Sequence, residues 1–469
     1  NGTVILGATA ALGTNTSTAA RGVDLGLNVG DTSMTNNVSL LISNGVSMGQ
    51  SIYVANNTNS ATRTLGLSGT GAAGSFTNEI YQDGDLILDA GSSTGVLTVS
   101  GNIVTNTAAV AKGLTITNGT VVLSGTNSYA GNTTVGAGGT MNLTGINSGS
   151  GLVTLPTLTS TMKINKTNGL QNGVLIGSSS STNAGLVDLT GGGNYSVRGL
   201  GTSATAAQNI SFTNSSGTVT TLTFTGGTNT ISSGSHGGKV VSNLSSNLTV
   251  VFSGAVEIGS STANDVTFTG PGNFTFNGAI TNSGAAARSI TKSGTGTMTV
   301  NASSTYNGGT AVNGGVFATG ANEVLLDAGA VTVASNAIFR LGGNESVASI
   351  AATSTFATND LQSYTLTVGG TGASFTNSAT IIGTGKIVKT GAGLMYLDNS
   401  ANTNTGGYTL SAGEIQFTSS GNAASGVLTN SVFGTGTLTL NGGALSSSSA
   451  SSGRSVFNKV IRNGNVQFG

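Results

Sequence analysis

The stretch that decides the fold is "SITKSGTGTMTVNASSTYNGGTAVNGGVF", residues 289–317. Its run "TMTV" alternates polar and apolar residues, which is the period-two pattern of a short strand. Gly-Gly pairs flank the next such run, "TAV", and glycine is the residue that tight corners accept most readily. The stretch therefore predicts short strands that are closed by turns.

Closely related text recurs along the chain. Residues 119–138, "GTVVLSGTNSYAGNTTVGAG", align without gaps with residues 296–315 of the opening stretch, and a third copy begins at Ile387. We place the copies near residues 97–145, 274–320 and 386–419, with a partial copy, "FGTGTLTLNGGAL", at residues 433–445.

Two residue types hold matching places in these copies. Tyr129 corresponds to Tyr306, and Lys292 corresponds to Lys389. Tyrosines along one face could stack on sugars, but we expect Tyr129 and Tyr306 to pack in register from coil to coil as structural residues.

The repeats indicate how the apolar faces are buried. One copy cannot cover its own apolar face, whereas stacked copies can, because each strand pairs with its counterpart one coil above and below. The chain is therefore predicted to be an all-β, single-chain parallel β-solenoid, continuous over residues 1–469. At roughly 20–25 residues a coil, it would have about 20 coils and form an elongated body.

Composition supports this prediction. The 469 residues include 76 Gly, 2 Pro and no Cys, hydrophobic residues reach 37%, and only 6% of residues are charged. Helical periodicity is nearly absent, and the best exception, "ANEVLLDAGA" (321–330), would give a turn or two at most. No linker or shift in composition divides the chain.

Charge and cysteine usage exclude several classes of function. The formal net charge is zero, and the 15 basic residues are scattered singly, which argues against nucleic acid and anionic membrane as partners. No apolar run approaches the ~18 residues of a membrane-spanning helix. The absence of Cys excludes disulfides, Cys-zinc sites and thiol chemistry. We expect no cofactor.

The opening stretch resembles the autotransporter-associated β-strand repeat, and "GAVTVASNAIFRLGGNESVASI" (329–350) is similar to the coil that often follows it in bacterial autotransporter passengers. The resemblance implies a right-handed parallel β-helix exported to the surface of a Gram-negative-type bacterium. The family's signal peptide and membrane barrel are absent from this chain, so we expect it to be a segment of a longer one.

The densest acidic group is "EIYQDGDLILDA", in which Asp83 and Asp85 would share a face if they lay on a strand. They are weak candidates for a Ca²⁺ site or a catalytic carboxylate pair. The alternative, which we favour, is a solvated "DGD" turn. His236, the only histidine, lies in a Gly/Ser loop and is expected to be exposed and inert.

The leading hypothesis for function is a non-enzymatic structural or adhesive β-helical rod, extracellular or on the bacterial cell surface. Its partners would be host-cell or glycan surfaces. A second hypothesis is a subunit of an extracellular filament that joins copies of itself end-to-end or laterally, because uncapped solenoid ends expose unpaired strands. A third is a polysaccharide-degrading β-helix enzyme, which the scarcity of acidic residues disfavours.

Overall fold

The computed structural model describes most of the chain: residues 2–8, 23–25, 36–56, 61–105, 111–176, 185–202, 209–231, 238–259, 265–448 and 454–469. These residues form strands, turns and bends, and no helix occurs among them. The strands make parallel sheets that are stacked as a β-solenoid of about 16 turns. The predicted fold class is therefore confirmed.

By their internal contacts, the residues group into two compact units. The first is Asn1–His236 with Asn247–Thr249, and the second is Gly237–Ser246 with Val250–Gly469. A single continuous solenoid over residues 1–469 stays a prediction, and the units are described separately below.

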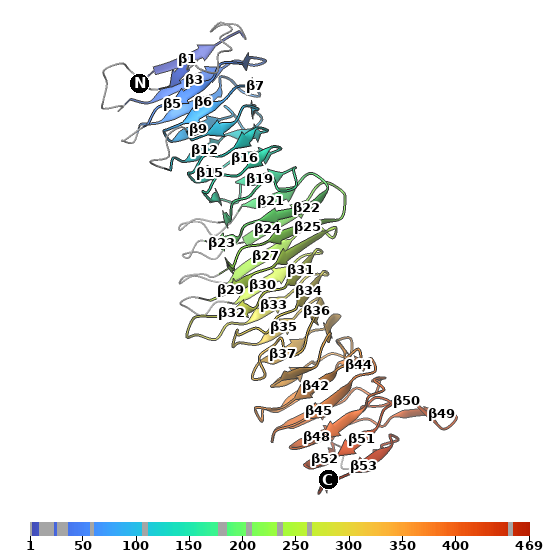
Figure 1. Ribbon diagram of the computed structural model, residues 1–469. Coiled ribbons are helices and arrows are strands. Elements are labelled where there is room, and N and C mark those ends of the chain that lie inside the picture. Colours follow the sequence, from blue (N-terminus) through green and yellow to red (C-terminus); the bar gives the residue numbers. More distant parts are fainter. Residues whose placement is uncertain are drawn as a thin grey trace. The chain divides into compact units, whose positions relative to one another are not determined.

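In the first unit, two long ladders run from turn to turn (Figure 1). One follows the order β1 (Gly2–Leu6), β3 (Val38–Ile42), β6 (Arg63–Leu67), β9 (Leu86–Asp89), β12 (Leu114–Thr117), β15 (Thr133–Val135), β18 (Val153–Leu155), β20 (Val174–Ile176) and β23 (Leu200–Thr202). The other follows β4 (Ser47–Met48), β7 (Ala73–Phe76), β10 (Val96–Val99), β13 (Gly119–Leu123), β16 (Gly139–Leu143), β19 (Thr161–Ile164), β21 (Leu186–Leu189) and β24 (Asn209–Asn214).

Shorter strands complete the turns of this unit. They are β2 (Val23–Leu25), β5 (Ile52–Val54), β8 (Ile80–Gln82) and β11 (Ile103–Val104) in one sheet, β14 (Thr126–Asn127) with β17 (Ile146–Asn147), β22 (Gly193–Val197) with β25 (Thr220–Phe224), and β26 (Thr228–Thr230).

The second unit repeats this arrangement. One ladder contains β27 (Lys239–Asn243), β30 (Val266–Thr269), β33 (Ile290–Lys292), β35 (Thr310–Val312), β37 (Ala330–Val333) and β40 (Ser349–Ala351). The next contains β28 (Leu248–Phe252), which belongs to this unit from Val250 onward, β31 (Asn273–Phe276), β34 (Thr297–Val300), β36 (Gly315–Thr319), β38 (Ala337–Arg340), β41 (Thr358–Asp360) and β44 (Thr380–Ile382).

Three further sheets belong to this unit. They are β29 (Ala255–Glu257) with β32 (Ile280–Thr281), then β39 (Glu345–Val347), β42 (Thr365–Val368), β45 (Lys386–Lys389), β47 (Tyr408–Leu410), β51 (Leu438–Leu440) and β53 (Val460–Arg462), and then β43 (Phe375–Asn377), β46 (Leu394–Leu397), β48 (Glu414–Phe417), β52 (Ala444–Ser447) and β54 (Gln467–Phe468).

The register shows how much chain one turn consumes. Ile290 pairs with Thr310 in the next turn, a step of 20 residues, as the sequence suggested. Tyr408, however, pairs with Leu438, a step of 30 residues. Longer turns of this kind explain why the chain makes about 16 turns instead of the 20 expected.

The core lies inside each unit, where alternate residues of every ladder meet. In β34, Met298 and Val300 are buried, and the alternating residues Thr297 and Thr299 face outward. Aromatic residues stack between turns: the rings of Phe317 and Phe339 are 6.1 Å apart. Alternation along the strands thus generates the apolar columns predicted from the sequence.

One pair of strands departs from the parallel pattern. β49 (Asn422–Ala424) and β50 (Val427–Asn430) form an antiparallel hairpin that extends away from the ladders of its own unit in Figure 1. Ser425 and Gly426, at its tip, both have positive φ (51° and 82°), which suits a two-residue hairpin turn. The candidate helix at residues 321–330 is instead a series of bends and a turn that lead into β37.

Candidate functional site

The "DGD" segment is the bend between β8 and β9, so Asp83 and Asp85 do not lie on a strand. Asp83 is buried and accepts a hydrogen bond from the Tyr53 hydroxyl (2.6 Å). Asp85 is exposed and accepts one from the backbone amide of Gly113 (2.7 Å). Each carboxylate therefore supports a neighbouring turn. A Ca²⁺ site or catalytic pair at these two residues stays a prediction.

The neighbouring acids also bind to the protein itself. Glu79 accepts a hydrogen bond from the Tyr81 hydroxyl (2.6 Å), and Asp89 accepts from Gly91 N (2.8 Å). Within the described ranges, no group of three or more His, Cys, Asp or Glu residues is placed to hold a metal ion. His236 lies outside the described residues.

Buried lysines lie at matching corners in two of the repeat copies. Lys292 ends β33 and is only 1% exposed, because it follows Ile290 by two residues and so shares its inward face. Its ammonium donates to the carbonyls of Ser293 (2.8 Å), Gly294 (3.0 Å) and, one turn further on, Gly314 (3.1 Å).

Lys389 forms the same corner in another copy. It ends β45, is fully buried, and donates to the carbonyls of Thr390 (2.5 Å), Gly391 (2.9 Å) and, in the next turn, Ala412 (3.4 Å). The matching lysines in the aligned sequence were the available signal for this corner, but sequence reasoning assigned no role to them.

These corners satisfy backbone groups at an electrostatic cost. Burial lowers the pKa of Lys292 to about 8 and also lowers the pKa of Lys389. The carbonyl dipoles stabilise the ammonium, while the loss of solvation opposes it. Each lysine thus ties two successive turns together through backbone carbonyls.

Tyrosine–threonine pairs lie at the corner that precedes the strand, whereas the lysines lie at the corner that follows it. The hydroxyls of Tyr306 and Thr310 are 2.6 Å apart, and those of Tyr129 and Thr133 also form a hydrogen bond. Tyr129 in addition accepts from Asn147 Nδ2 (3.2 Å) in the next turn. Burial raises the pKa of Tyr129 to about 12. Both tyrosines are buried, which agrees with a structural role, while their packing in register from coil to coil stays a prediction.

In the third copy, the tyrosine occupies the place of the threonine, and a smaller residue occupies the place of the tyrosine. Asn404 stands four residues before Tyr408, just as Tyr306 stands four residues before Thr310. The Tyr408 ring now fills the core from β47 and packs edge-on against Phe433 with ring centroids 5.6 Å apart. The corner is thus filled in either order of large and small side chain.

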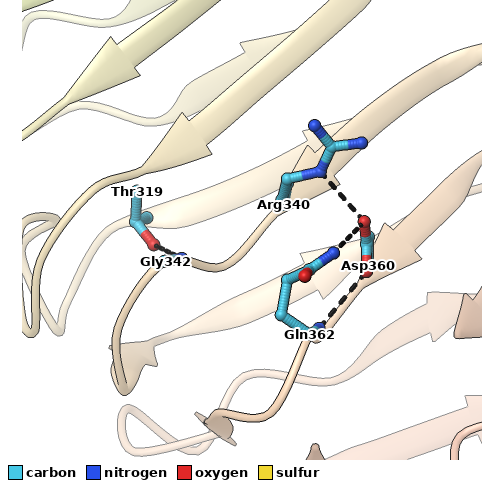
Figure 2. A network of polar contacts seen from close by, with 5 residues as sticks. All are labelled: Thr319, Arg340, Gly342, Asp360 and Gln362. Atoms are coloured by element: carbon cyan, nitrogen blue, oxygen red, sulfur yellow. Dashed lines mark hydrogen bonds and ion pairs between the residues drawn. The ribbon is translucent and has the colours of Figure 1, made fainter. Parts of the chain in front are cut away.

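A polar cluster lies on the outward face of the second unit (Figure 2). Arg340 of β38 stands directly opposite Asp360 of β41, and its Nε lies 2.9 Å from Asp360 Oδ2. Gln362 donates from its side-chain amide to Oδ2 (2.7 Å) and from its backbone amide to Oδ1 (3.2 Å). Nearby, Gly342 N donates to the Thr319 hydroxyl (3.0 Å) and fixes the corner after β38.

The first unit carries two open grooves that share Arg198 in their walls. One, of about 320 Å³, has Leu152, Gly173 and Thr228 among its lining residues. The other, of about 360 Å³, includes Gln171. Among the described residues that line these grooves, Arg198 is the ionisable one.

The stacked turns and their buried corners define a parallel β-solenoid repeat protein. Residues 118–143, 290–318 and 387–417 match the family described as passenger-associated-transport-repeat. The chain therefore contains repeats of this family, which confirms the predicted resemblance to autotransporter passenger repeat proteins. Neither a curated protein nor a solved structure matches the chain significantly.

The matched segments fall within the three copies seen in the sequence. The partial copy at residues 433–445 contains β51 but lies outside them, so its membership stays a prediction. In the described part of the chain, no helix is long and apolar enough to cross a membrane.

Proposed function

We propose that the chain is a non-enzymatic passenger segment, extracellular or exposed on a bacterial cell surface, that serves a structural and adhesive role. The observation that supports the proposal is that the buried polar side chains of the repeats form their hydrogen bonds within the chain. Lys292, Lys389 and the Tyr306–Thr310 pair are buried and bond within the chain itself, which leaves an outward surface of weakly charged strands.

Surface exposure is tested with antibodies raised against the purified chain. They are expected to label intact cells of the producing bacterium as strongly as lysed cells, and external protease is expected to remove the label. Labelling that appears only after lysis would overturn the proposed location.

The absence of catalysis needs its own test. We expect no release of reducing ends from neutral or uronic-acid polysaccharides, with Asp83→Asn and Asp85→Asn as controls. Turnover that either substitution abolishes would replace the structural function by the enzymatic one.

A self-assembling filament is the second candidate, because the strands of a solenoid's outer turns can pair with those of another copy. Electron microscopy of the purified chain separates the candidates: fibres of uniform width favour the filament, and dispersed particles favour the monomeric passenger.

A further inference from the structure

We propose that Arg340 binds an oxyanion, a carboxylate or sulfate, carried by an acidic polysaccharide. The inference gives the proposed adhesive role a ligand class. It concerns the outward face of β38 and β41, which neither the repeat match nor the buried corners involve.

The first argument is the free capacity of the guanidinium. An arginine has five N–H donors in a rigid planar fork. In the described part of the chain, the partner of Arg340 is Asp360, which Nε engages. The four N–H groups of the two Nη atoms remain, and Figure 2 shows both terminal nitrogens directed away from Asp360. A bidentate oxyanion fits that edge of the fork.

The second argument is that the fork is held in place. The Asp360 side chain is only 7% exposed, whereas that of Arg340 is 42% exposed. Asp360 is fixed from behind by two donors of Gln362, its side-chain amide and its backbone amide. A guanidinium that is already oriented loses less entropy on binding than a free surface arginine does.

The third argument is the neighbouring surface. Phe356, in the turn just before β41, is 73% exposed, and three residues separate it from Asp360, so their Cα atoms are at most about 14 Å apart. Thr358 faces outward between them. A few linked sugar rings can bridge an aromatic platform and an arginine at that spacing, with one ring against Phe356 and an acidic group at Arg340.

The test measures binding by isothermal titration calorimetry to polygalacturonate and dextran sulfate, with uncharged dextran as the ligand control. Arg340→Gln is expected to weaken binding to the acidic polymers at least about tenfold, the loss of one charge-assisted bidentate contact. The matched control is Arg462→Gln, since Arg462 is also an exposed arginine of this unit whose Nε bonds a carbonyl, that of Gly464 (3.0 Å). It is expected to bind as the unmodified protein does.

Asp360→Asn separates a built site from general charge attraction. This change makes the protein more positive, so unspecific attraction would strengthen binding, whereas loss of the oriented fork weakens it several-fold. Circular dichroism and thermal melting of each variant check the fold. No binding to either acidic polymer, or equal binding by Arg340→Gln, would overturn the proposal while leaving the surface location untouched.

Discussion

At the scale of single residues, the solenoid buries lysine ammonium groups and stabilises them with backbone carbonyl groups. Lys389 has three carbonyl partners, and no carboxylate is among the hydrogen-bond partners that it has in the described part of the chain. An unpaired buried carbonyl costs about 1–3 kcal/mol, so one ammonium that satisfies three carbonyls can offset its own desolvation. The lysine therefore acts as a tie between turns.

Lys389→Met removes this tie and leaves three carbonyls without their donor. We expect the free energy of unfolding to fall by about 2–3 kcal/mol, since the lost hydrogen bonds outweigh the relief of burying a charge. Lys386→Met is the matched control, because Lys386 lies on the same strand but is exposed, and it should change stability by less than about 0.5 kcal/mol. Urea denaturation measures both, and equal effects would refute the role of Lys389.

Glu345 is a buried acid whose hydrogen-bond partners are backbone amides. It is 1% exposed, and its two carboxylate oxygens accept from the backbone amides of Val324 (3.1 Å) and Leu325 (3.0 Å). Burial raises its pKa to about 8, although those two hydrogen bonds act in the opposite direction. Between pH 4.5 and about 8, the folded protein therefore keeps a proton on Glu345, whereas the unfolded chain has released it.

This difference predicts a pH dependence of stability. Between pH 4.5, the ordinary value, and about 8, the folded state binds the extra proton, so the free energy of unfolding falls as pH rises. The slope is at most about 1.4 kcal/mol per pH unit. Glu345→Gln removes the titrating group, so the stability of the unmodified protein relative to this variant should decline across that window. A pH-independent difference between the two proteins in urea titrations would contradict the shifted pKa.

At the scale of the element, glycines let one turn approach the next. A Cβ at Gly308, in the Gly-Gly corner before β35, would overlap the backbone carbonyl group of Arg288 in the preceding turn. The corner sequence is thus required by close backbone contact as well as by turn geometry. The same reason explains why the two aligned copies keep glycine at this place, as Gly131 and Gly308.

Gly308→Ala should therefore push adjacent turns apart and lower the free energy of unfolding by about 1–3 kcal/mol. Gly370→Ala serves as the control, because a Cβ there meets nothing within 4 Å and its φ is not in the left-handed region. That control should be neutral or stabilising by up to about 1 kcal/mol. Thermal unfolding compares the two variants, and a neutral Gly308→Ala would show that the turns can separate freely.

At the scale of the whole molecule, a solenoid turn contacts mainly its neighbours, so stability is close to a sum of local terms. In hydrogen exchange, Gly308→Ala should accelerate exchange of the amides in β33 and β35 and leave those of β13, in the first unit, unchanged. Mass spectrometry of peptides from both units provides the measurement. Uniform acceleration along the chain would instead reveal one global unfolding unit.

The sequence alone determined the strand faces and the corners. Alternation in runs such as "TMTV" indicates which side chains point inward, and a Gly-Gly pair such as Gly308 and Gly309 indicates where the chain turns. Because these signals are local, they were sufficient for the solenoid class and for the three repeats. They aligned Lys292 with Lys389 but did not reveal that either lysine is buried, or which groups it binds.

Only the tertiary structure determined which residues contact one another across successive turns. The carbonyl of Gly314 reaches Lys292, and Asp360 stands beside Arg340, because the length of each intervening turn sets the register between strands about 20 residues apart. Turn length varies, as the 30-residue step at Tyr408 shows, and the period-two pattern carries no information about it. Contacts within a strand are encoded locally, whereas contacts between strands depend on how much chain each corner consumes.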